Sequence, residues 1–188
     1  MRHPVAVDRC EQCGFVYGGI GTADIPDAMR ALSLQYQDAL LEPGVAGLVR
    51  MRPAPDVWSA LEYACHVRDV WLVQRDRAIL ALVEDTPTYA RMCRDERTYL
   101  AGYQREDVTE VAGEVVMGAN LMAKLFEGLA SHQLARPCIY NYPEPLERDV
   151  AWLGHHTLHE ATHHLEDLRS ALARVGCTVG PIPIAPPR

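Results

Sequence analysis

Apolar residues recur at helical spacing in four long segments of the chain. In residues 24–41 the apolar positions lie three or four residues apart, which is the spacing of one helix face. They are Ile25, Met29, Leu32, Tyr36 and Leu40. A second helix is predicted to begin at a cap on Asp56 and to run to about Val83, where the sequence Glu-Asp-Thr-Pro ends it.

Two further helices are predicted in the second half of the chain. Asp107 followed by Glu110 resembles a capping box and starts a helix over residues 108–132. The last helix is predicted from about Arg148 to Val175, and Gly176 stops it. No segment shows the alternation typical of a strand, and residues 88–104 fit either a short helix or an ordered loop. The pattern therefore predicts an all-α four-helix bundle with at least one long crossover connection.

The segments outside these helices define the expected domain organisation. Residues 1–22 form an irregular N-terminal arm with a Cys-x-x-Cys motif, residues 23–176 form the bundle, and residues 177–188 form a proline-rich tail. A chain of 188 residues suits one domain with a real core.

Composition and charge exclude several classes of partner. The net charge is −7 and Lys124 is the only lysine, so the chain offers no basic surface for nucleic acid. The apolar runs are too short and too often broken by charge to span a membrane. The N-terminus lacks the apolar core of a secretory signal, so we expect a cytoplasmic protein with reduced thiols.

The sequence GHHTLHEATHHLED, residues 154–167, places five of the eight histidines within one predicted helix. At 100° per residue, His164 lies within roughly 50° of the centre of the apolar face, Glu160 within roughly 90° and Asp167 within roughly 110°. His159 and His163 lie roughly 150–170° from that centre. The helix therefore carries two sets of metal-binding side chains on two faces.

The inner set predicts a metal site. Glu160 and His164 are four residues apart, so their side chains stand one above the other and can share an ion. Asp167, one turn further on, is placed to accept the second ring N–H of a ligating histidine. His66 in the second helix is the candidate third ligand, although a lone histidine there could equally be a hydrogen-bonded residue at the edge of the core.

The number of ligands decides what such a site can do. Three protein ligands leave a position open for water or a substrate, as a catalytic centre requires, whereas a fourth from Glu62, Asp69 or His156 would close it. His155 is expected to lie on the surface.

These residues resemble a known family. WSALEYACHVRDVWLVQRDRAIL, followed some 70 residues later by HEATHHLEDL, looks like the DinB-like metal-dependent superfamily, including its mycothiol-dependent maleylpyruvate isomerase branch. The resemblance implies a four-helix bundle with up-down-down-up topology that binds zinc or nickel. It also implies that His66, Glu160 and His164 are the ligands, since the glutamate, the histidine and the following Asp167 match the isomerase variant. The two-histidine variant of the family would instead select His159 and His163.

The same resemblance implies a chemistry. A divalent metal would activate mycothiol or a related low-molecular-weight thiol for attack on an electrophilic small molecule, which is transferase or isomerase chemistry. Two alternatives remain open at this point: activation of water for hydrolysis, and a non-enzymatic, stress-associated bundle that binds a metal or a small ligand. A homodimer is expected by analogy with similar bundles.

The Cys-x-x-Cys motif in CEQCGF suggests a second site. Cys10 and Cys13 have the spacing of half a zinc knuckle, and His159 and His163 are free for a Cys2His2 set if the arm folds over the last helix. The competing interpretations are a redox pair and two unpaired thiols beside exposed histidines.

Overall fold

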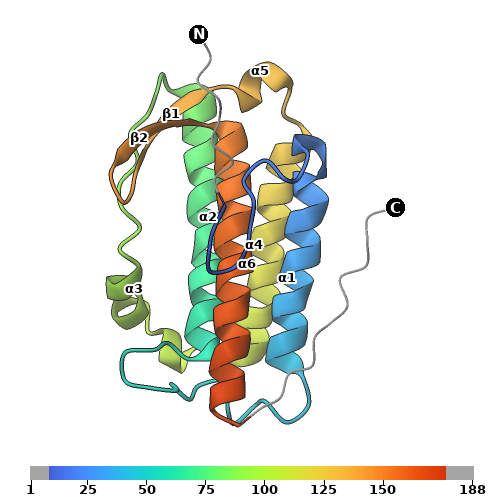
Figure 1. The fold of residues 1–188 in the computed structure, drawn as a ribbon, viewed down its shortest axis with the longest axis vertical. Helices are drawn as coiled ribbons and strands as arrows, with labels where there is room; N and C mark the ends of the chain where they lie inside the picture. The colour runs from blue at the N-terminus through green and yellow to red at the C-terminus, as the bar shows by residue number, and fades with distance from the viewer. Residues whose placement is uncertain (1–8, 177–188) are drawn as a thin grey trace.

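Four long helices form a bundle in the computed structural model, which describes residues 9–176 (Figure 1). They are α1 (Ile25–Leu41), α2 (Ala60–Val83), α4 (Val108–Glu127) and α6 (Val150–Arg174). α1 and α6 run in one direction and α2 and α4 in the other (Figure 1), and α4 and α6 each pack against both α1 and α2. This confirms the predicted bundle and the topology that the family resemblance implies.

The connection between the parallel helices α2 and α4 is the predicted long crossover. It contains α3 (Arg94–Leu100) and the short 3-10 helix η2 (Tyr103–Arg105), so the segment 88–104, which the pattern left open, is a short helix between loops. A further 3-10 turn, η1 (Thr22–Asp24), precedes α1, and the short helix α5 (Ser131–Leu134) follows α4. Residues 1–8 and the predicted tail, 177–188, lie outside the described residues, and the division into arm, bundle and tail stays a prediction.

The helix ends agree with the predicted caps except in α2 and α4. Asp107 caps α4 and accepts hydrogen bonds from the backbone of the first turn, but α4 ends at Glu127 rather than at residue 132 because Gly128 follows it. The prediction that Asp56 caps α2 is wrong. Ser59 is the cap, because the carboxylate of Glu62 accepts its backbone N–H at 2.8 Å and completes a capping box.

A β-hairpin corrects the expectation that the chain has no strand. β1 (Pro137–Asn141) pairs antiparallel with β2 (Pro145–Asp149), and Ile139 also exchanges backbone hydrogen bonds with Pro87 and Tyr89. The strands are too short to show an alternating pattern, and three prolines in or beside them disfavour a strand in sequence-based reasoning. The hairpin leads directly into α6 and so sets where that helix begins.

The core lies between the four helices and is sealed by large aromatic residues. Trp71, Tyr36 and Tyr103 are completely buried, and the Tyr36 hydroxyl donates a 2.6 Å hydrogen bond to the carbonyl of Ala161 in the middle of α6. This fixes the position of α6 along α1. Among the described helices, none is both long and apolar enough to cross a membrane.

Candidate metal centre

Three predicted ligands from two helices converge beside the core. His66 comes from α2, Glu160 and His164 come from α6, and one potential ligand atom of each lies within 4.8 Å of the other two. The Nε2 atom of His164 is 3.7 Å from Oε2 of Glu160, and the imidazole rings of His66 and His164 are 4.8 Å apart. Bonds of about 2.0–2.2 Å to a tetrahedral zinc would place neighbouring N and O ligands about 3.4 Å apart. The three side chains therefore fit one ion after a small adjustment.

The environment of His66 fits a metal ligand better than a histidine that only fills the edge of the core. Only 2% of the residue is exposed, and both of its ring nitrogens are buried without a hydrogen-bond partner among residues 9–176. A buried polar group left without a partner costs about 1–3 kcal/mol, so a histidine that served only to fill the core edge would be expected to hold a hydrogen bond. A metal ion would satisfy one of the two nitrogens.

The charges of the three side chains suit a cation. Burial, together with the proximity of His164, lowers the pKa of His66 to about 3, so His66 is neutral and can act as a ligand at neutral pH. Burial alone would raise the pKa of Glu160, but the hydrogen bond from His164 and the neighbouring His156 lower it well below its ordinary value. Burial opposes a charge on His164, but Asp167 and Glu160 raise its pKa. The pocket thus places a carboxylate beside two imidazoles, which is a donor set that suits a cation.

Asp167 holds His164 in orientation. Its Oδ2 atom lies 2.9 Å from Nδ1 of His164, which leaves Nε2 pointing towards Glu160. Since a carboxylate accepts a hydrogen bond, Nδ1 carries the proton and Nε2 is the nitrogen available to a metal.

The three residues considered as a fourth ligand have other partners. Glu62 binds the guanidinium of Arg52 and the cap of α2, and Asp69 accepts the hydroxyl of Tyr103 at 2.7 Å as well as contacts from two arginines. His156 is close to Glu160, but its two ring nitrogens contact the hydroxyls of Tyr17 at 2.8 Å and Tyr140 at 3.0 Å. In the described structure, each of these three side chains is therefore engaged by partners other than the inner set.

The open side of this set faces a cavity of about 600 Å³. His66, Glu160 and His164 form part of its lining. Its other walls come from the hairpin, the loop before α3 and the N-terminal arm, which contributes Tyr17. A volume of this size is typical of sites that bind a small molecule. Four arginines also line it: Arg77, Arg91, Arg94 and Arg148.

Sequence reasoning missed the aromatic wall of the cavity. Tyr17 and Trp152 stack on His156 and Tyr140 contacts it edge-on, but the three come from the arm, the first turn of α6 and the hairpin. No periodicity connects residues on three such elements, so the pattern carried no signal for them. The expectation that His155 lies on the surface is also wrong: the residue is buried, and its Nε2–H donates to the carbonyl of Ile20 at 2.9 Å.

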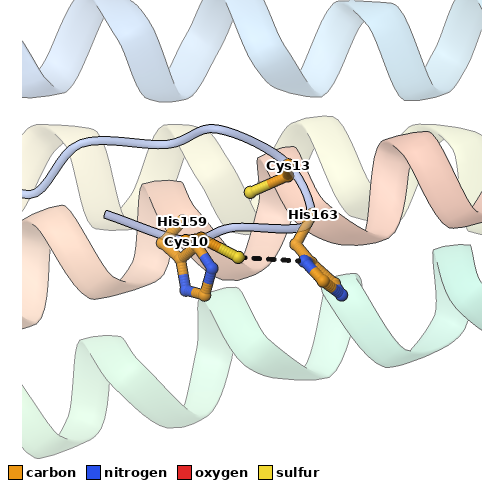
Figure 2. Close-up of side chains that lie close together, drawn as sticks. All are labelled: Cys10, Cys13, His159 and His163. Carbon is orange, nitrogen blue, oxygen red and sulfur yellow. Dashed lines mark hydrogen bonds between the residues drawn. The ribbon is translucent and has the colours of Figure 1, made fainter. Parts of the chain in front are cut away.

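The outer set is also brought together. Cys10 and Cys13 on the arm and His159 and His163 on α6 offer ligand atoms that all lie within 4.8 Å of one another, and Figure 2 shows the arm folded over α6 at this point. Both histidines are only partly exposed, and they line the same cavity as His66, Glu160 and His164.

Comparisons with known proteins agree with this architecture. The model of the DinB superfamily matches residues 30–168. In structure the chain is similar to YfiT from Bacillus subtilis, with a TM-score of 0.72 and 15% sequence identity over 82% of this chain and 87% of that one. YfiT is described as a probable metal-dependent hydrolase with an unusual four-helix bundle topology. No curated protein matches the chain in sequence.

Proposed function

The chain belongs to the DinB superfamily, and from this premise we propose that it is a divalent-metal-dependent enzyme that joins a low-molecular-weight thiol, of the mycothiol type, to an electrophilic small molecule. One observation carries the proposal: three donor side chains, one of them a buried histidine without a hydrogen-bond partner in residues 9–176, lie at an open cavity. We propose His66, Glu160 and His164 as the ligands and Asp167 as the residue that positions His164.

The donor set favours zinc or nickel. Imidazole nitrogen and a single carboxylate oxygen are suitable ligands for both ions, whereas calcium and magnesium prefer sites built from oxygen alone. A divalent ion bound by three protein ligands supplies one chemical effect, which is to lower the pKa of a thiol or a water molecule that occupies the open position.

The residues of the chain itself would do the rest. Glu160 supplies a negative charge, which together with two neutral imidazoles leaves a bound divalent ion with a net charge of +1 to stabilise an anionic thiolate. The stacked rings of Trp152 and His156, with Tyr140 packed edge-on against them, form a wall against which a substrate can pack. The arginines at the cavity could bind polar or anionic groups of either reactant.

The cavity of about 600 Å³ admits either thiol transfer or hydrolysis, the reaction class attributed to YfiT. Thiol transfer is the first candidate because Glu160, His164 and Asp167 match the pattern of the thiol-dependent branch of the family. Hydrolysis is the second candidate, and a non-enzymatic bundle that only binds metal is the third.

The test begins with elemental analysis of the purified protein and of the variants His66→Ala and His164→Ala. We expect each variant to lose the ion of the inner site, whereas the control His132→Ala, which removes an exposed histidine on α5, keeps it. The metal-loaded protein is then assayed for consumption of an electrophile with and without mycothiol.

The outcomes separate the three candidates. Thiol-dependent turnover that is lost in both variants supports thiol transfer. Turnover of ester or amide substrates without a thiol, lost in the same variants, would replace it with hydrolysis. Bound metal with neither activity would leave only the binding role.

A further inference from the structure

We propose that Cys10, Cys13, His159 and His163 bind a second ion, a structural zinc that clamps the N-terminal arm onto α6 and thereby fixes one wall of the cavity. This site is separate from the inner ligand set, and it does not depend on which reaction the inner set performs.

The four side chains meet in a geometry close to that of a tetrahedral site. Figure 2 shows Cys10 and Cys13 on the arm above His159 and His163, which lie one turn apart on α6. The sulfur of Cys10 is 3.7 Å from Nδ1 of His163. Zinc with Zn–S bonds of about 2.3 Å and Zn–N bonds of about 2.0–2.1 Å places such a pair of ligands about 3.6 Å apart. The separation of this pair in the structure is therefore close to the one that a shared zinc ion requires.

The backbone of the arm is shaped to present two sulfurs on one side. The N–H of Cys10 donates to the carbonyl of Phe15 at 2.9 Å, and the N–H of Gly14 donates to the carbonyl of Cys10 at 2.8 Å. Gly14 has φ +71°, a conformation that side chains disfavour, so the turn depends on the glycine that follows the second cysteine. A redox pair would not need two histidines facing the turn, but a metal site would.

The same turn directs peptide N–H groups at the thiols. The backbone N–H groups of Cys13 and Gln12 bond to the sulfur of Cys10 and lower its pKa. Burial raises the pKa of Cys13 to about 11, but the N–H of Phe15 bonds to its sulfur and acts in the opposite direction. Both sulfurs thus accept peptide N–H groups of the same turn.

The two histidines each hold one ring nitrogen in place and leave the other for a ligand. Nδ1 of His159 lies 2.9 Å from the hydroxyl of Tyr17, while its Nε2 is buried and has no hydrogen-bond partner in the described structure. Nδ1 of His163 faces Cys10, and its Nε2 lies 3.6 Å from the carboxylate of Asp167. The orphaned nitrogen of His159 is an observation independent of the cysteines.

Charge and coordination number identify the ion and its role. Two thiolates and two neutral imidazoles neutralise a divalent ion and fill a tetrahedral shell, which is the composition of structural zinc sites. No position is left for a substrate. The arm residues Cys10, Gln12 and Tyr17 line the cavity, so an ion that fixes the arm also fixes that wall.

Asp167 connects this site with the inner one. One of its oxygens is 2.9 Å from Nδ1 of His164 and 3.6 Å from Nε2 of His163, so a single carboxylate lies behind one ligand of each set. Binding of zinc at the outer site would orient His163 and leave the carboxylate in place for His164.

The experiment measures zinc per chain and the atoms around it. We expect two equivalents in the wild-type protein expressed with zinc, and one in the double variant Cys10→Ser/Cys13→Ser. The variant His66→Ala/His164→Ala should also keep one, and X-ray absorption of that zinc should show two sulfur neighbours at about 2.3 Å. Cys93→Ser removes an exposed thiol outside both ligand sets and should keep two equivalents.

Two kinds of result are informative: those that overturn the outer zinc site, and those that test it separately from the proposed function of the inner site. The proposal is overturned if the Cys10→Ser/Cys13→Ser protein retains both equivalents of zinc. It is also overturned if the His66→Ala/His164→Ala protein contains no sulfur-bound zinc. Wild-type protein with one sulfur-bound zinc that survives His66→Ala/His164→Ala would support it while removing the proposed enzyme site. Should the serine variant fail to fold, His163→Cys replaces one ligand by another and should keep the second zinc that His163→Ala loses.

Discussion

Replacing Asp167 by asparagine tests how the inner site is held. Asparagine keeps the shape of the side chain and an oxygen that can accept the N–H of His164, so the substitution removes mainly the charge from a 2.9 Å contact. Loss of such a supporting carboxylate typically costs about 10- to 100-fold in metal affinity, or about 1.4–2.7 kcal/mol. The Asp167 side chain is 36% exposed whereas that of His164 is 8% exposed, so solvent screens part of the interaction. We therefore expect the lower end of the range, about a tenfold weaker binding.

The affinity is measured by competition with a chromophoric chelator. The Cys10→Ser/Cys13→Ser background confines the signal to the inner site. Glu166→Gln is the matched control, because it removes the same charge from the neighbouring, exposed position on α6 and should change the dissociation constant by less than about twofold. Asp167→Ala, which also removes the acceptor, should weaken binding further than Asp167→Asn. Equal affinities for Asp167→Asn and Glu166→Gln would refute the assigned role of Asp167.

Three further predictions concern stability. Burial would raise the pKa of Glu62, but Arg52 and Ser59 hold it below its ordinary value of 4.5. The stability that the Glu62 carboxylate contributes is therefore complete above about pH 4.5 and is lost as the pH falls through the lowered pKa. In denaturant unfolding, Glu62→Gln should have a free energy of unfolding about 2 kcal/mol below that of the wild type at pH 7, and this difference should shrink in acid. Gly154→Ala should lower the melting temperature by about 2–4 °C, because the added carbon would lie 2.6 Å from the ring of Phe126, whereas Gly113→Ala, which meets no atom within 4 Å, should raise it through helix propensity. When the free metal is held at about a thousand times its dissociation constant, adding a chelator should lower the free energy of unfolding by about 4 kcal/mol per site. A melting temperature that the chelator leaves unchanged would count against bound metal.

The helices and the shared face of Glu160 and His164 could be predicted from the sequence because both depend on local spacing. The predicted span 24–41 differs by one residue from α1, and the caps at Asp107 and Gly176 act where the motif placed them. Glu160 and His164 share a face because they are four residues apart on one helix, which needs no knowledge of the tertiary fold.

The features that escaped prediction depend on contacts between distant segments. His155 was assigned to the surface because the wheel gives it no partner, yet the arm supplies the carbonyl of Ile20. The cap of α2 fell on Ser59 because a capping box outcompetes a lone aspartate three residues earlier. The hairpin depends on strand pairing and on a contact with Tyr89, neither of which leaves a periodic trace.

Both proposed ligand sets include residues from two successive turns of α6, so the pitch of this one helix sets the spacing of these ligands. A single residue inserted or deleted between positions 160 and 163 would turn everything beyond it by about 100° and shift it by about 1.5 Å along the axis. Such a change would split both the His159–His163 pair and the Glu160–His164 pair, and would separate the tyrosine-bound side of the helix from Asp167. Evolution of this segment should therefore tolerate exchange of residues far more readily than any change in its length.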